Sequence, residues 1–306
     1  MICCLQFIVQ IKVNDTLEVV GLVSLDPVLA GEEESEAEMS VTPRVGPPSL
    51  VPRLHVLTYT RTRHNNPLLP LFGPLPAVQP VARVELHTIL TACMLGDTLA
   101  ADFLLLHLIS RVYLRRDVLV LGKLSLNLHG LAGAGEWPRR LATVLSLLTP
   151  QSHYLPLTRD TLQQTAFQPK KDFEANRLVA GQLQLPAGTH LWLDETVMTN
   201  GQLDATGLRN LTTLGNLITW QRLEYDFQFQ TLEYDTDLPC LVMSEGRSLL
   251  PSDAAVLVQP KQEATPEQIS STFVEIGKGL CKELLDRVRQ FLTICRLAEY
   301  QLTDQV

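Results

Sequence analysis

The chain has 306 residues, of which 45% are hydrophobic and 19% are charged, so its length suggests about two globular domains. Its formal net charge of −8 argues against a protein that binds bare DNA or RNA by neutralising phosphates. None of the six cysteines has the Cys-x-x-Cys spacing of a zinc site or a redox dithiol, and the longest apolar run, residues 103–109, is too short to span a bilayer. We therefore expect an intracellular protein without a membrane span.

Residues 1–62 predict a partial OB-like β module. The strand signals are the alternating or β-branched runs at 7–13, 17–25 and 50–60, with Gly21 as a possible bulge. An acidic loop that also contains prolines, residues 31–48, separates the second and third strands. Three strands leave edges unpaired, so the module is not a complete barrel.

Five prolines between residues 63 and 80 predict a stiff linker, because each one fixes its own backbone and biases the preceding residue toward extended forms. Residues 81–306 then alternate helix and strand patterns, which indicates an α/β sheet domain. The helix patterns cover 81–94, 99–113 and 141–148. The strand patterns cover 118–121, 123–128, 177–185, 189–193, 216–220 and 240–243, and a glycine-rich turn follows at 130–135.

The domain is predicted to end in a long helix. Thr265 and Gln268 have the spacing of a capping box, and apolar residues recur at three- and four-residue steps from 269 to 295. Gly277 and Gly279 weaken or split this helix.

Two adjacent carboxylates end the buried-strand pattern at residues 191–195. Asp194 and Glu195 have the form of a Walker B pair, in which one carboxylate holds magnesium and the other orients water. The alternative is a strand end whose carboxylates cap the next turn or meet solvent.

Residues 94–102 stand where a phosphate-binding loop would belong. Such a loop needs several glycines, a lysine for the phosphate charge and a serine or threonine for magnesium. Here Gly96 remains, no lysine follows it, and Asp97 and Asp102 place negative charge where a polyphosphate would lie. The remnants of this degenerate site are Gly96, Asp97, Asp194 and Glu195. We expect no catalytic residue, metal ligand or cofactor.

Several longer motifs resemble one known family. They are Val13–Glu18, Leu25–Leu29, Leu99–Ser110, Arg115–Leu119, Asn216–Gln221 and Ser244–Pro251. In this order they resemble the mini-chromosome maintenance (MCM) complex-binding protein family over essentially the whole chain.

The resemblance implies a degenerate MCM/AAA-like α/β domain preceded by the partial OB-like module. In that light Gly96-Asp97 is similar to the Gly-Asp of an MCM phosphate loop, and Asp194-Glu195 to its Walker B pair. It also implies a nuclear, non-catalytic partner of MCM helicase subunits, acting in MCM assembly and removal from chromatin, DNA replication and sister-chromatid cohesion. Members of the family are usually longer, so we expect a fragment or an alternative product.

Two functional hypotheses follow. The first is a nucleotide-silent interaction protein that contacts MCM subunits and, through them, chromatin, with no sequence-specific nucleic acid, membrane or small-molecule substrate of its own. The alternative is a weak nucleotide-binding or hydrolysing AAA-type ATPase, which requires Lys123 or Arg116 to reach the phosphates. Single-strand binding through the β module is disfavoured by the acidic balance of the chain.

Overall fold

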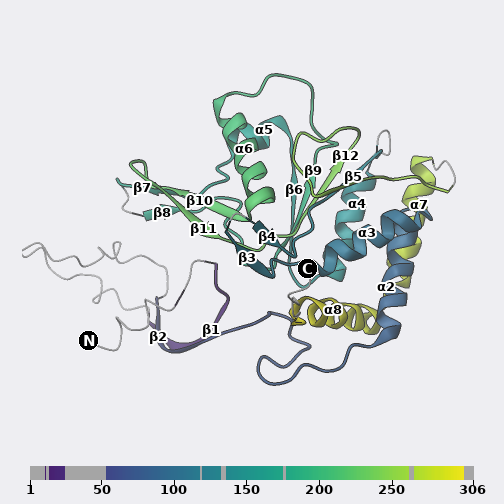
Figure 1. Cartoon of the computed structure of the whole chain (residues 1–306), viewed down its shortest axis with the longest axis horizontal. Helices are drawn as coiled ribbons and strands as arrows, with labels where there is room; N and C mark the ends of the chain where they lie inside the picture. The colour runs from purple at the N-terminus through teal and green to yellow at the C-terminus, as the bar shows by residue number, and fades with distance from the viewer. Residues whose placement is uncertain are drawn as a thin grey trace, which may run out of the picture.

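The computed structural model describes residues 11, 14–24, 53–117, 119–131, 136–174, 177–261 and 265–299. The acidic loop at 31–48 lies outside the described residues, as does the predicted strand at 7–13 apart from residue 11. Figure 1 shows helices gathered around a central sheet, so the predicted α/β class is confirmed at that level.

The central sheet is wholly parallel. Its strands are β5 (Leu126–His129), β6 (Ser152–Pro156), β9 (His190–Asp194), β12 (Cys240–Ser244) and β13 (Ala254–Leu257). Their order in the sheet is β13-β5-β12-β9-β6, which reads 5-1-4-3-2 when the strands are ranked along the chain. Every residue of β9 and β12 is buried, because both faces of the sheet are covered and both strands are almost continuously apolar.

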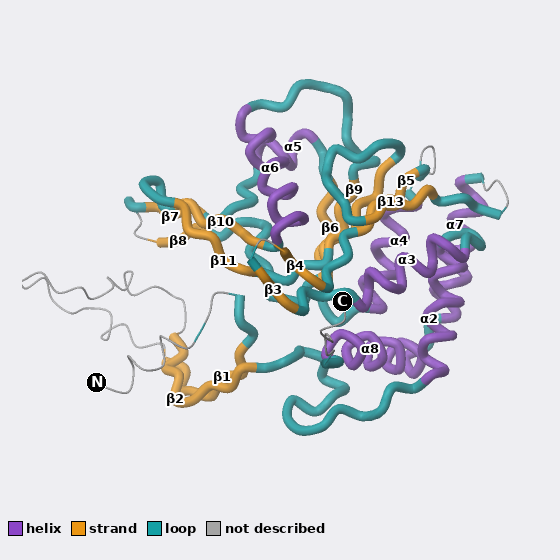
Figure 2. The backbone as a smooth tube through the Cα atoms, viewed as in Figure 1, coloured by secondary structure: helices purple, strands orange, loops and turns teal. Residues whose placement is uncertain are grey.

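Helices cover both faces of this sheet (Figure 2). One apolar cluster contains α2 (Pro80–Cys93), α3 (Thr98–Ile109), α4 (Trp137–Leu148), α7 (Pro266–Gly279) and α8 (Lys282–Leu297). A second cluster contains α5 (Arg159–Gln164) and α6 (Ala205–Trp220). Trp192 belongs to the first cluster while Leu191 and Leu193 belong to the second, as the alternation of a strand requires. No helix among the described residues is long and apolar enough to cross a membrane.

Among the described residues, three smaller sheets accompany the central one. β1 (Leu17–Ser24) pairs antiparallel with β2 (Arg53–Arg61), and β3 (Leu114–Arg116) with β4 (Leu119–Leu121). A four-stranded sheet has the order β11 (Thr231–Asp235), β10 (Arg222–Asp226), β7 (Lys170–Asp172) and β8 (Arg177–Val179). The register of β1 on β2 shifts between Val20 and Gly21, which confirms the predicted bulge. A Cβ on Gly21 would lie 2.3 Å from the carbonyl oxygen of His55.

The linker packs against the last helix. Residues 63–79 contain neither helix nor strand, as predicted. Asn66 is buried, however, and its Nδ2 donates to the carbonyl oxygen of Arg289 (3.2 Å) and to Thr293 Oγ1 (2.9 Å), both in α8. This segment is therefore anchored and is not a free spacer.

Three predicted elements differ from the structure. The strand predicted at 216–220 is wrong, because these residues form the last turns of α6; a short apolar run does not distinguish a strand from a buried helix. The helix predicted to reach residue 113 ends at Ile109, since Ser110 has an extended backbone. The strand predicted at 177–185 is limited to 177–179.

The predicted long helix at the end of the chain is split, which was one of the two effects expected of Gly277 and Gly279. The capping box of Thr265 and Gln268 is confirmed, but α7 ends at Gly279 and α8 begins after Cys281, whose backbone is extended. Glycine destabilises a helix interior by about 1 kcal/mol relative to alanine, so Gly277 and Gly279 favour a break here. The break lets both helices turn their apolar faces to one cluster.

Candidate functional site

Asp194 is the last residue of β9 and is buried. Its carboxylate accepts hydrogen bonds from Tyr154 Oη (2.6 Å), from the backbone N–H of Thr196 (2.9 Å) and from Thr196 Oγ1 (2.6 Å). Burial, together with the bond to Asp194, raises the pKa of Tyr154. The carboxylate therefore caps the turn that follows the strand, as in the second of the two interpretations above.

Glu195 is held by the loop after β12. Its backbone N–H donates to the carbonyl oxygen of Met243 (2.9 Å), and its carboxylate accepts from Ser248 Oγ (2.8 Å) and from the backbone N–H of Leu249 (3.3 Å). Burial raises the pKa of Glu195, although these hydrogen bonds oppose the shift. Both carboxylates at the carboxyl edge of the sheet thus have protein partners. The described residues include no group of three or more His, Cys, Asp and Glu that could hold a metal ion.

Gly96 and Asp97 lie in the connection between α2 and α3. Gly96 has a φ of +92°, and Asp97 is the N-cap of α3. The Asp97 carboxylate accepts from the backbone N–H of Ala100 (3.1 Å) and of Gln259 (2.8 Å). A phosphate loop joins a strand to a helix and leaves the helix N-terminus open to the anion. The assignment of the loop to this segment is therefore wrong, since the connection joins two helices and an aspartate occupies the N-terminus.

A strand, a glycine-rich loop and a helix do occur in the required order from β5 to α4. Residues 130–137 read GLAGAGEW, so Gly130 and Gly135 have the G-x4-G spacing of a phosphate loop. Glu136 and Trp137 occupy the positions of its lysine and its serine or threonine. Sequence reasoning noted the glycines but missed this spacing, which directly follows an apolar strand. Residues 132–135 lie outside the described part of the chain.

The described ends of this loop are bonded to the protein itself. The backbone N–H of Gly130 donates to the carbonyl oxygen of Glu245 (3.0 Å), and that of Leu131 to the carbonyl oxygen of Ser244 (3.4 Å). Trp137 is 3% exposed, and its Nε1–H donates to the carbonyl oxygen of Cys93 (3.1 Å).

Glu136 is exposed and forms an ion pair with Arg140 at 3.0 Å. A carboxylate thus stands where a nucleotide site places a cation, and a buried indole stands where the magnesium ligand belongs.

The cations required by the ATPase hypothesis lie elsewhere. Lys123 Nζ is 2.6 Å from Asp253 Oδ1, and these residues precede β5 and β13, at the amino edge of the sheet. Arg116 belongs to β3, and the contacts of its neighbour Arg115 show where this strand lies. Arg115 donates to the carbonyl oxygens of residues 220, 221 and 236, which come before β10 and β12. The phosphate loop would open at the opposite edge, so the idea that Lys123 reaches phosphates there is wrong.

A family model and the similar proteins all point to one family. The sequence model of the mini-chromosome maintenance replisome factor family matches residues 6–306. Mini-chromosome maintenance complex-binding protein from Salmo salar is 42% identical over 318 residues, covering 96% of this chain and 50% of that protein. The protein of the same name from Homo sapiens is 39% identical over 322 residues, and that from Drosophila melanogaster is 37% identical over 307 residues. The chain spans about half the length of the curated relatives it matches.

Proposed function

The chain belongs to the mini-chromosome maintenance replisome factor family, and from this membership we propose that it binds MCM helicase subunits without catalysing a reaction. The names of its relatives support the partner, since each is called a complex-binding protein. We further propose that it acts in the nucleus, regulates the assembly of these subunits on chromatin or their removal during DNA replication, and contributes to sister-chromatid cohesion.

The sequence of the loop between β5 and α4 carries the non-catalytic part of the proposal. Phosphoryl transfer depends on positioning and on stabilisation of charge. Glu136 replaces the lysine that would meet the phosphates, and Trp137 replaces the hydroxyl that would bind magnesium. Asp194 and Glu195, the carboxylates that would serve magnesium and water, already accept hydrogen bonds from protein groups.

The topology supports descent from an ATPase. The loop after β5 and the carboxylate pair after β9 lie at the same carboxyl edge of a 5-1-4-3-2 parallel sheet, with helices on both faces. Ligands of open α/β sheets bind at this edge. We propose a degenerate AAA/MCM-like domain, with residues 1–62 as a partial OB-like module and 63–80 as the linker.

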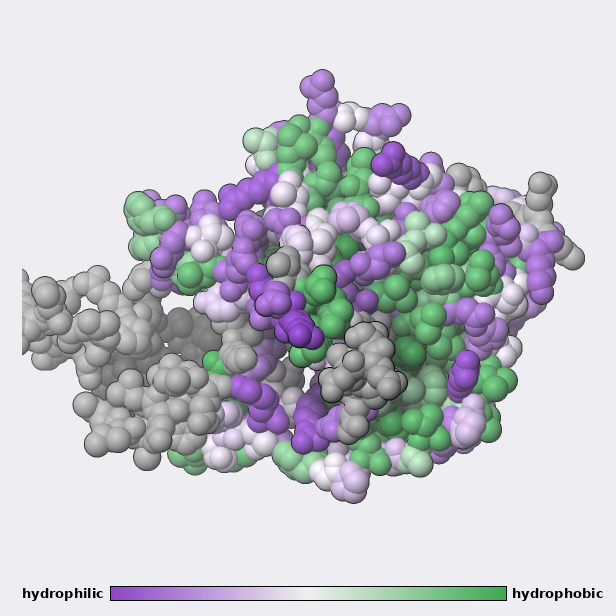
Figure 3. All heavy atoms as spheres, in the orientation of Figure 1, coloured by the Kyte–Doolittle hydropathy of each residue, from purple (hydrophilic) through white to green (hydrophobic). Residues whose placement is uncertain are grey.

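Exposed apolar surface supports a protein partner. Leu22 and Val23 of β1 are 65% and 69% exposed, and Leu57 of β2 is 67% exposed. Figure 3 shows hydrophobic surface over the region of α2 and α3, which carry the exposed side chains Val84 and Leu99. Extended apolar patches on a folded protein are typical of protein–protein contacts.

A mimic of an MCM subunit needs no chemistry to act. It would occupy the face that a true subunit offers to its neighbour, and so compete with closure of the ring. Such competition requires only a higher affinity for free subunits than for subunits in a ring.

The test is a pull-down of the tagged chain against purified MCM subunits, with and without Mg-ATP. We expect equal capture in both conditions, and equal capture by the variant Glu136→Gln, because the carboxylate has no role in binding. Capture that requires ATP would instead favour the weak ATPase. A folded sample that captures no subunit would contradict the proposal.

A further inference from the structure

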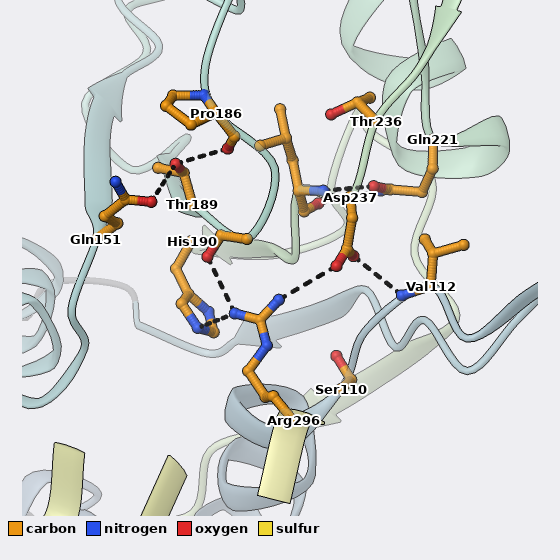
Figure 4. A network of polar contacts seen from close by, with 12 residues as sticks. Ser110, Val112, Gln151, Pro186, Thr189, His190, Gln221, Thr236, Asp237 and Arg296 are labelled. Carbon is orange, nitrogen blue, oxygen red and sulfur yellow. Dashed lines mark hydrogen bonds and ion pairs between the residues drawn. The ribbon is translucent and has the colours of Figure 1, made fainter. Parts of the chain in front are cut away.

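A cavity of about 180 Å³ lies at the amino edge of the central sheet, away from the carboxyl edge described above. Figure 4 shows its polar network, in which the last turn of α8 meets the segments that precede β9 and β12. Its charged and imidazole lining residues are Arg63, His64, Arg111, His190, Asp237 and Arg296.

Arg296 is the centre of this network. It is largely buried, and its Nη1 donates to the carbonyl oxygen of Gly188 (3.0 Å) and to His190 Nε2 (3.0 Å), while its Nη2 donates to Asp237 Oδ2 (3.4 Å). These bonds fix the plane of the guanidinium. Within the described part of the chain they use three of its five N–H donors, so two remain for an acceptor other than these groups.

Arg111 supplies a second guanidinium to the same cavity. Its Nη2 donates to the carbonyl oxygen of Ala298 (3.1 Å), but its Nε is buried without a hydrogen-bond partner among the described residues. Burial lowers the pKa of Arg296, and the like charge of Arg111 adds to this effect while Asp237 opposes it. Among the described residues, three arginines and one carboxylate line the cavity, so this part of the lining carries a net charge of +2 with histidine neutral.

His190 is the buried imidazole that holds Arg296 in place. It is 1% exposed, and burial followed by the charge of Arg296 keeps its pKa well below the ordinary value. Because Nε2 accepts from Arg296, the proton of the neutral ring is on Nδ1, and that buried atom has no partner within the described ranges. His190 Nδ1 and Arg111 Nε lie within the wall of the cavity and not on its surface, so the groups that can meet a ligand are the remaining guanidinium N–H donors of the lining arginines.

The volume and the net charge of the cavity indicate which class of ligand it can bind. A volume of about 180 Å³ is several times the ~30 Å³ that a water molecule occupies in the liquid, but below the ~300 Å³ at which pockets for drug-sized ligands begin. The cavity has room for one oxyanion group. The planar fork of arginine matches phosphate oxygens two at a time. A phosphate monoester, with a charge of about −2, would balance the lining.

We propose that this cavity binds a single phosphate group, either the free ion or one carried by a phosphorylated side chain of a partner protein. The site does not depend on the carboxyl edge of the sheet, and it goes beyond the binding function proposed above.

The test is calorimetric titration of the whole chain with inorganic phosphate, against sodium chloride of equal ionic strength. We expect saturable binding at one site. Arg111→Gln should weaken it by about tenfold or more, because a hydrogen bond from a charged donor is lost. Arg63→Gln, at an exposed position of the linker, should fold normally and weaken binding by roughly two- to fivefold, as expected for a solvated charge. Arg209→Gln is the matched control, since Arg209 pairs with Asp226 on the small sheet and should leave binding unchanged.

A parallel titration with a short phosphoserine peptide identifies the source. Tighter binding of the peptide than of the free ion, with competition between them, assigns a phosphorylated side chain; binding of inorganic phosphate alone assigns the free ion. Equal affinity of acetate and phosphate would overturn the proposal. So would equal affinities for wild type, Arg111→Gln and Arg63→Gln, or no saturable heat from a folded wild-type sample.

Discussion

Replacing Asp194 by alanine tests whether this carboxylate holds the fold together or serves a ligand. The substitution removes three hydrogen bonds to one buried charge, from Tyr154 Oη and from the backbone and hydroxyl of Thr196. A bond to a charged group contributes about 1.5–3 kcal/mol, but Tyr154 and Thr196 are only partly buried and regain water. We therefore expect a loss of roughly 3 kcal/mol, well below the additive sum.

Urea unfolding of the variants measures this loss. At about 2–4 °C per kcal/mol, Asp194→Ala should also lower Tm by roughly 6–12 °C. Tyr154→Phe removes one of the three bonds, and a double-mutant cycle of Tyr154 with Asp194 should give a coupling free energy of about 1–2 kcal/mol. Asp102→Ala is the control, because Asp102 is exposed and its loss should change stability by less than about 0.5 kcal/mol.

The same samples measured with Mg-ATP decide between the two roles. A structural carboxylate predicts that Mg-ATP leaves the unfolding of wild type and Asp194→Ala unchanged. If Asp194→Ala were as stable as wild type, and Mg-ATP raised the Tm of wild type alone, the reasoning from the hydrogen bonds would be refuted.

Three further substitutions, the last with a glycine control, test the electrostatics and the backbone. Burial raises the pKa of Glu195 in the folded state. The stability of the wild type should therefore fall as the pH rises from the ordinary glutamate pKa through the folded pKa. Glu195→Gln should remove this pH dependence from the urea midpoints measured between pH 4 and 7. Burial favours a higher pKa for Asp253, but hydrogen bonds from Lys123 and a neighbouring serine outweigh it and lower the pKa. The stability that Asp253 contributes is then present above the ordinary aspartate pKa and lost as pH falls through the lowered folded pKa. Asp253→Asn should therefore be less stable than wild type at pH 7, and the difference should shrink as the pH falls below the ordinary aspartate pKa. Gly130 has a φ of +89°, and an added Cβ would lie 2.7 Å from the side chain of Leu257 at the end of β13. Gly130→Ala should therefore lower the free energy of unfolding by about 1–3 kcal/mol, measured by thermal unfolding. Gly246→Ala is the control: an added Cβ there would have open space around it, so its stability should be nearly unchanged.

Local patterns were sufficient for the elements that are apolar throughout or explicitly capped. The runs at 189–193 and 240–243 became β9 and β12, and the capping box at Thr265 marks the start of α7. The run at 216–220 failed because it is too short to show its helical period, which becomes clear only from the start of α6 at Ala205.

Part of the candidate site could likewise be predicted from local sequence, and part of it could not. The position of Asp194 and Glu195 follows from the strand before them, so it was recoverable from sequence. Which glycine-rich segment faces that strand end depends on the order of the strands in the sheet, which no local pattern contains. The partners of Arg296 come from residues 188, 190 and 237, so the cavity was beyond sequence reasoning.

The position of α8 sets a lower limit on when the chain can finish folding during its synthesis. Asn66 Nδ2 bonds to Thr293, 227 residues later, and Val288, Phe291 and Leu292 complete the same apolar cluster as α2. At roughly 5–20 residues per second, a ribosome needs about 10–45 s to make the intervening segment. Throughout that time the faces of α2 and α4 that α8 will cover remain open to water or to a chaperone. Contacts of such long range also close slowly, so the nascent chain has a prolonged period in which these apolar faces are available for aggregation.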